Sequence, residues 1–308
     1  MAPEELAREL RAVLERVLLP GLAAVLPWSW CTRLYWLLAR AGFLYRGEID
    51  AAWEHARHYL PTDPLWKRRA RFHLLVDNAD YFLTLFRGRR WMARHIAVTG
   101  GENLPAGVNA MLLVTFHWGQ GFWALRWLRE RGQPAAWLHA PVASRLRPGG
   151  YVSGLMGRLR IRQVARLSGA RPIPVGGSIS AMRERLQHAR LPVMAMPDAP
   201  LRPGQRTLAI ELLGRPARIA AGVITMAAED RLPVHAYTMR VDPLTGQRHL
   251  AIGPRLPDGD PAVLAQALAD VLSGAIREDP AAWYVWAFAG GFFPSAAGME
   301  EQDGANDG

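Results

Sequence analysis

The chain has 308 residues, of which 50% are hydrophobic, so it is long enough to bury one large core. Its formal net charge of +10 is carried almost entirely by arginine, because Lys67 is the only lysine, and it favours acidic partners such as anionic lipids, phosphates or an acidic carrier protein. The single cysteine, Cys31, excludes an internal disulfide bond and a zinc site built from several cysteines.

The first hundred residues predict helices. Residues 17–30, VLLPGLAAVLPWSW, are uncharged. The segment is nevertheless too short to span a bilayer, and Pro20 and Pro27 interrupt its helical pattern. This segment and the apolar residues 34–45 are typical of helices at a bilayer interface, and they are equally compatible with helices that pack on the core. A further helix is expected over residues 65–86, where apolar side chains recur at three- and four-residue intervals.

From residue 95 strands and helices alternate. Strands are predicted over residues 95–100, 111–116, 135–138, 170–175, 191–196, 207–212 and 233–240, followed by an antiparallel edge strand over 248–253. Helices are predicted over residues 119–131, 151–167, 178–190, 218–229 and 262–276.

This alternation predicts an α/β fold with a mostly parallel mixed sheet flanked by helices, preceded by an N-terminal helical segment that associates with a membrane. We expect an N-terminal helical region over residues 1–94, an α/β domain over 95–296 and a disordered acidic tail over 297–308.

Two side chains capable of acid–base chemistry follow predicted strands. His117 comes directly after the strand at 111–116, and Asp198 follows the strand at 191–196. If these parallel strands are neighbours, the imidazole and the carboxylate meet at the edge where ligands gather. A histidine beside a carboxylate suits general-base catalysis, although a lone histidine is more often bonded to backbone. Gly119 and Gln120 are then expected to face a substrate, with glycine leaving the backbone open.

No serine nucleophile is evident, because GGSIS at residues 176–180 lacks the Gly-x-Ser-x-Gly elbow. Direct transfer of a group to an acceptor hydroxyl is therefore the simpler chemistry. The nine histidines are scattered, so no metal site is expected.

The residues around His117 also suggest a family. LLVTFHWGQGFWALRWL, at 112–128, resembles the His-x4-acid block of the bacterial lipid A lauroyl/myristoyl acyltransferases, members of the lysophospholipid acyltransferase-like superfamily, in which a histidine and an acid five residues later form the catalytic pair. Residues 166–240 resemble the later blocks, with Asp198 at the family's DQ or DR position and LLGRPAR, at 212–218, at its FFGxPA position. The N-terminal apolar helix and HLLVDNADYFLTLF, at 73–86, lie where the family has its membrane-associated helix and the helix before the domain.

This resemblance implies a peripheral enzyme at the cytoplasmic face of the inner membrane that acts in late acylation of lipid A type, and so in lipopolysaccharide biosynthesis. Such an enzyme moves a fatty acyl chain from acyl carrier protein, or acyl-CoA, onto a hydroxyl of a membrane lipid or glycolipid, without a further cofactor. His117 becomes the general base, but Phe122 occupies the place of the family's acid and cannot orient an imidazole. We expect Asp198, or second Glu211, to supply the carboxylate; a loop-capping Asp198 and a solvent-facing Glu211 are the alternatives.

A group of arginines resembles the basic segment of the family's second block. It consists of Arg158, Arg160, Arg162 and Arg166. These side chains suit binding of the phosphopantetheine of a carrier protein or of a lipid phosphate, and a solvated basic face is the alternative.

Three other functions compete with this one. The chain can be a catalytically inactive relative that binds lipid, or an acyltransferase for another membrane product such as a pigment, a polyketide or an ornithine-type lipid. Nucleic-acid binding is disfavoured, because no recognition motif is present and the aromatic residues cluster with apolar ones.

Overall fold

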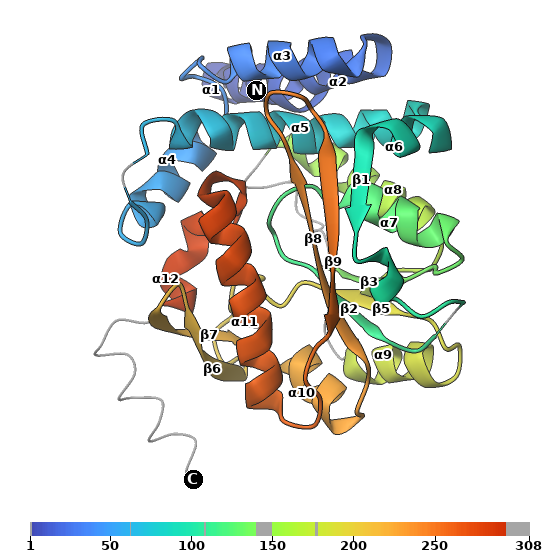
Figure 1. Ribbon diagram of the computed structural model, residues 1–308. Coiled ribbons are helices and arrows are strands. Elements are labelled where there is room, and N and C mark those ends of the chain that lie inside the picture. The colour runs from blue at the N-terminus through green and yellow to red at the C-terminus, as the bar shows by residue number, and fades with distance from the viewer. Residues whose placement is uncertain (1, 62, 108, 140–149, 176–177, 294–308) are drawn as a thin grey trace.

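A seven-stranded sheet lies at the centre of the fold, with the strand order β1-β9-β8-β2-β5-β3-β4 (Figure 1). The computed structural model describes residues 2–61, 63–107, 109–139, 150–175 and 178–293, so the predicted tail at 297–308 lies outside the described residues. The strands are β1 (Ile96–Thr99), β2 (Leu112–Val114), β3 (Ala136–His139), β4 (Ile173–Pro174), β5 (Val193–Ala195), β8 (Val234–Val241) and β9 (Arg248–Arg255).

Neighbouring strands of this sheet run parallel except for β8 and β9, which are antiparallel. The predicted mostly parallel mixed sheet is therefore confirmed. The short strand β2 is in the middle and all three of its residues are buried, as expected for a strand covered on both faces. The prediction of residues 248–253 as an edge strand was wrong in one respect, because β1 pairs with β9 on its outer side and forms the edge.

Helices surround the sheet, and in Figure 1 α11 lies to one side of β8 and β9 while α7 and α8 lie to the other. These helices are α7 (Phe122–Glu130), α8 (Tyr151–Ser168), α9 (Ser178–Gln187), α10 (Gly222–Glu229), α11 (Pro261–Glu278) and the short α12 (Ala289–Phe292). Short 3₁₀ turns are formed by η2 (Gly101–Asn103), η3 (Pro280–Ala282) and η4 (Trp286–Phe288).

One predicted helix begins later than expected. Residues 218–229 were predicted to be helical, but β7 (Arg215–Ala220) pairs antiparallel with β6 (Thr207–Leu212), and α10 begins only at Gly222. The two strands are joined by Leu213 and Gly214, which have φ values of 56° and 78°. Two consecutive residues with positive φ make the tight turn that matches the twist of a hairpin, so the local turn overrides the helical pattern.

The N-terminal region is helical. Its elements are α1 (Pro3–Val13), a π-helical turn η1 (Leu14–Leu18), α2 (Leu19–Val25), α3 (Trp28–Leu38), α4 (Arg46–Ala56), α5 (Trp66–Phe86) and α6 (Arg89–His95). Figure 1 shows α1, α2 and α3 lying across α5 on the side away from the sheet. Because α5 is covered on two sides, it buries residues all around its axis rather than along the single predicted stripe. In the described part of the chain, no helix combines the length and the apolar character needed to cross a membrane.

A fully buried ion pair joins α5 to the sheet. Arg248 of β9 donates to the carboxylate of Asp80, and both side chains are inaccessible to solvent. The guanidinium also lies 4.4 Å from the ring centre of Trp28 and 5.1 Å from that of Trp91, so it meets α3 and α6 as well. Burial raises the pKa of Asp80 to about 6, although the charge of Arg248 acts in the opposite direction. The two groups therefore hold each other's charge in an apolar interior.

Removing one member of this pair is expected to destabilise the fold. The substitution Asp80→Asn leaves the Arg248 charge buried without its counter-ion, and we expect it to lower the free energy of unfolding by about 3–5 kcal/mol in urea titrations at neutral pH. The matched control is Glu54→Gln, which breaks the exposed pair with Arg57 and is expected to cost no more than about 0.5 kcal/mol. Equal losses in the two variants would contradict the assignment.

Candidate active site

The register of two neighbouring strands brings His117 and Asp198 together. Strands β2 and β5 are parallel neighbours in which Val114 is paired with Ala195. His117 lies three residues beyond Val114, and Asp198 lies three residues beyond Ala195. The two segments leave the same edge of the sheet in register, so His117 and Asp198 lie side by side beyond that edge. The predicted meeting of the two side chains is confirmed.

The carboxylate of Asp198 accepts hydrogen bonds from three donors. Its Oδ1 lies 2.9 Å from His117 Nδ1, and its Oδ2 accepts from the His117 backbone N–H at 2.8 Å. Oδ2 also accepts from Trp283 Nε1 at 2.9 Å. The Asp198 side chain is 1% exposed, whereas that of His117 is 30% exposed. The acid is thus enclosed by protein, while the imidazole is accessible to a substrate.

This geometry fixes the chemical role open to the imidazole. A carboxylate only accepts, so the proton lies on Nδ1 and Nε2 keeps the lone pair that can take a proton. Burial lowers the pKa of His117, but the charge of Asp198 and its hydrogen bond raise that pKa by more, and the net result lies above the ordinary value. The pair therefore stabilises the imidazolium that a general base becomes after it accepts a proton.

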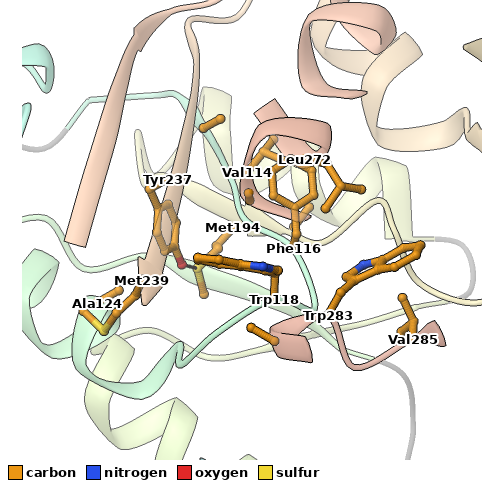
Figure 2. Close-up of a cluster of buried hydrophobic side chains, with 14 of the residues drawn as sticks. Val114, Phe116, Trp118, Ala124, Met194, Tyr237, Met239, Leu272, Trp283 and Val285 are labelled. Carbon is orange, nitrogen blue, oxygen red and sulfur yellow. Dashed lines mark hydrogen bonds between the residues drawn. The ribbon is translucent and has the colours of Figure 1, made fainter. Parts of the chain in front are cut away.

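Trp283 was missed by the sequence analysis. It lies 85 residues after Asp198, just beyond η3, and no spacing pattern connects the two positions. The indole is fully buried in a cluster with Trp118, and Figure 2 shows both rings among Phe116, Met194 and Val285. Its N–H fixes Oδ2 and so leaves Oδ1 for the imidazole. The aromatic sequence AAWYVW was the only available signal, and it indicates burial rather than a role at the site.

The residues after His117 hold the turn instead of facing solvent. Gly119 has a φ of 69°, and a Cβ at this position would lie 1.9 Å from the carbonyl oxygen of Met239 in β8. A glycine is needed at position 119 because the backbone of the turn approaches the backbone of β8 closely. The side chain of Gln120 is completely buried and lies 3.3 Å from His73 Nδ1 and from the Tyr284 hydroxyl. Both residues are thus held by contacts within the protein, and their predicted substrate contacts stay a prediction.

Glu211 is not brought to the imidazole. It lies on β6 with an exposed side chain, and its backbone N–H donates to Gln266 of α11 at 2.8 Å. Of the two carboxylates predicted as partners, the structure places only Asp198 beside His117.

Phe122 and the predicted arginines lie on α7 and α8. The buried ring of Phe122 is covered by Arg160, whose guanidinium carbon lies 4.6 Å from the ring centre. Arg160 also forms an ion pair with Asp77 of α5 at 2.8 Å, so it ties three helices together. Arg166 donates to the carbonyl oxygen of Thr84 at 3.2 Å. Arg158 and Arg162 are one helical turn apart and exposed, so of the four they are the pair most available to a phosphate.

No known family model matches the chain, and no curated protein matches it in sequence. Within the described residues, no group of three or more histidine, cysteine, aspartate or glutamate side chains is placed to hold a metal ion.

The link between His117 and Asp198 can be measured on the imidazole itself. In the variant Asp198→Asn the negative charge that raises the pKa is lost while burial remains, so we expect the pKa of His117 to fall below its ordinary value of about 6.5. The measurement is an NMR titration of the His117 ring. Glu211→Gln is the control and is expected to leave that pKa unchanged. A fall in Glu211→Gln but not in Asp198→Asn would reverse the assignment.

Proposed function

We propose that the protein is an O-acyltransferase that moves a fatty acyl chain from the thioester of acyl carrier protein, or of acyl-CoA, to a hydroxyl of a membrane lipid or glycolipid. The observation that carries the proposal is the accessible imidazole of His117 held by the buried carboxylate of Asp198 at the carboxyl edge of a parallel sheet. The resemblance of residues 112–128 and 166–240 to the lipid A acyltransferases supports it, because the same histidine and aspartate stand at matching positions of the motifs.

The proposed reaction uses one base and no covalent enzyme intermediate. His117 Nε2 takes the proton of the acceptor hydroxyl as the oxygen attacks the thioester carbonyl carbon. The C–S bond breaks when the tetrahedral intermediate collapses, and the imidazolium returns its proton to the leaving thiolate. Asp198 stabilises the imidazolium between these two transfers. The products are an ester and a free thiol.

The N-terminal helices support a site at the membrane surface. Large apolar side chains are exposed on these helices, on the turn after α3 and on the turn between β8 and β9: Leu6, Leu10, Leu18, Val25, Trp30, Leu37, Phe43 and Leu244. The turn belongs with α3, because Trp28 Nε1 donates to the carbonyl oxygen of Gly246 at 2.8 Å. Exposed Arg33 and Arg40 accompany this surface and suit anionic head groups. We propose that these helices bind the cytoplasmic face of the inner membrane.

For the acyl acceptor we propose a class of molecule, one that presents a hydroxyl at a membrane surface. Lipid A-type late acylation is the first candidate, and a pigment, a polyketide or an ornithine-type lipid are others with a hydroxyl at a membrane surface. The exposed arginines Arg158 and Arg162 suit an acidic carrier protein or a lipid phosphate. A catalytically inactive lipid-binding protein is the second candidate function, favoured by Phe122 at the position of the family's acid.

The deciding experiment is acyl transfer from a mixed pool of acyl carrier protein thioesters and acyl-CoA to a total membrane lipid extract, read by mass spectrometry. We expect the wild type to add one acyl mass to a defined lipid, and His117→Ala to lower the rate by about 10²–10⁴-fold because the general base is lost. The control is His188→Ala, an exposed histidine at the end of α9, which is expected to keep the wild-type rate. Anionic-vesicle binding without any acyl transfer by the wild type would instead support the inactive relative.

Membrane binding can be tested apart from catalysis. Replacing Leu6 and Leu10, which are adjacent on one face of α1, by glutamine removes apolar area that a bilayer would cover. Each buried leucine contributes about 1.5–3 kcal/mol, so we expect the partition coefficient onto vesicles with anionic lipid to fall at least about tenfold. Val263→Gln, at an equally exposed position on α11, is the control. A similar fall in both proteins would place the bilayer elsewhere.

A further inference from the structure

A second histidine–aspartate pair joins α5 to the segment after α11. His73 of α5 is 2% exposed at its side chain, and its Nε2 lies 2.8 Å from Oδ2 of Asp279, the residue that follows α11. The pKa of Asp279 lies below its ordinary value: burial raises it, whereas the hydrogen bonds from His73 and from the Ala281 N–H and the charge of Arg69 lower it. The ionised carboxylate accepts, and the proton of His73 therefore lies on Nε2.

This tautomer directs the rest of the network. His73 Nδ1 is left as an acceptor, and the Gln120 side-chain amide lies 3.3 Å from it and donates to it. The same amide donates to the Tyr284 hydroxyl at 3.3 Å, and that hydroxyl donates to the His73 carbonyl oxygen at 3.4 Å. Burial raises the pKa of Tyr284 well above its ordinary value, so the hydroxyl keeps its proton. Four side chains from α5, the turn after β2 and the segment after α11 thus form one polar network.

The segment after α11 also binds the turn that carries His117. The Tyr284 backbone N–H donates to the His117 carbonyl oxygen at 2.7 Å, and the Gly119 N–H donates to the Ala282 carbonyl oxygen at 3.0 Å. Trp118 Nε1 donates to the Asp279 carbonyl oxygen at 3.0 Å. Since Trp283 of the same segment binds Asp198, both members of the His117–Asp198 pair are held by residues 279–284.

We propose that His73, Asp279, Gln120 and Tyr284 form a positioning network that fixes the turn at residues 117–120, and through it the His117 imidazole against Asp198. The proposal rests on the proposed function only for its kinetic consequence. The hydrogen bonds of these four side chains described above go to one another and to backbone atoms and not to the His117 ring, so the network acts through the turn.

The composition of the network favours positioning over simple core packing. Gln120 Oε1 is buried and has no hydrogen-bond partner among the described residues, so the network leaves an acceptor unpaired. An unpaired buried acceptor costs stability, and an apolar residue of similar volume would avoid that cost. What a methionine at this place cannot supply is the donor that joins His73 to Tyr284.

The kinetic test separates turnover from binding. We expect Gln120→Met and His73→Leu each to lower kcat at least about tenfold, with KM for the acyl donor within about twofold, because a misplaced base slows the chemistry without removing a substrate contact. The double variant is expected to lose no more than the worse single variant, since both break one network. His73→Gln retains a donor for Asp279 and is expected to recover most of kcat. The control for loss of a buried histidine is His235→Leu, outside the network, with kcat near wild type.

A spectroscopic test holds even if the wild type transfers no acyl group. The Nδ1–H proton of His117 is held by Asp198 and is expected to give a slowly exchanging NMR signal in the wild type. In Gln120→Met that signal is expected to broaden or disappear while the protein remains folded. An unchanged His117 signal in folded Gln120→Met and folded His73→Leu would overturn the positioning role. Absence of acyl transfer by the wild type would overturn only the proposed function.

Discussion

The candidate site depends on one buried carboxylate. Asp198 has almost no contact with solvent, and its charge is balanced by three donors from two separate parts of the chain. Placing an ionised acid in an interior is costly unless its oxygens are bonded, so the strand ends and the Trp283 indole have to arrive together for the fold to accept it. Once they do, the only donor of the three that belongs to an accessible side chain is the His117 imidazole. The same condition that permits the buried acid therefore also orients the imidazole.

This arrangement explains how a phenylalanine can stand five residues after the histidine. An acid at position 122 would come from the first turn of α7, the helix that follows His117 in the sequence. Here the acid comes from the neighbouring parallel strand, and the start of α7 is free to carry a buried ring. Phe122 packs under Arg160, whose charge is taken up by Asp77. A carboxylate at position 122 would compete with Asp77 for Arg160, so the phenylalanine suits the packing of α5, α7 and α8.

The sequence predicted the features that depend on periodicity and strand ends. The alternation of apolar runs located the sheet, and the place of His117 and Asp198 after two such runs located their meeting point. It misplaced features set by local turn geometry or long-range pairing. The Leu213–Gly214 turn made a hairpin of residues predicted as helix, and β1 joined the outer side of β9 from more than 140 residues away. Trp283 and the His73–Asp279 pair could not be found because nothing local links positions so distant in the chain.

Helix α5 shows how polar contacts fix one element over another. His73, Asp77, Asp80 and Thr84 follow one another at three- and four-residue intervals, so they share one face of the helix.

The members of this face bind three different elements, and Thr84, like Asp77, contacts α8. His73 meets Asp279 after α11, Asp77 meets Arg160 of α8, and Asp80 meets Arg248 of β9. A shift of the helix by a turn would leave the buried Arg248 guanidinium without its counter-ion. The helix that lies under α2 and α3 is thereby held in one register above the turn of His117. His73 is the member of this face that contacts Gln120, so it links α5 directly to the turn that carries His117.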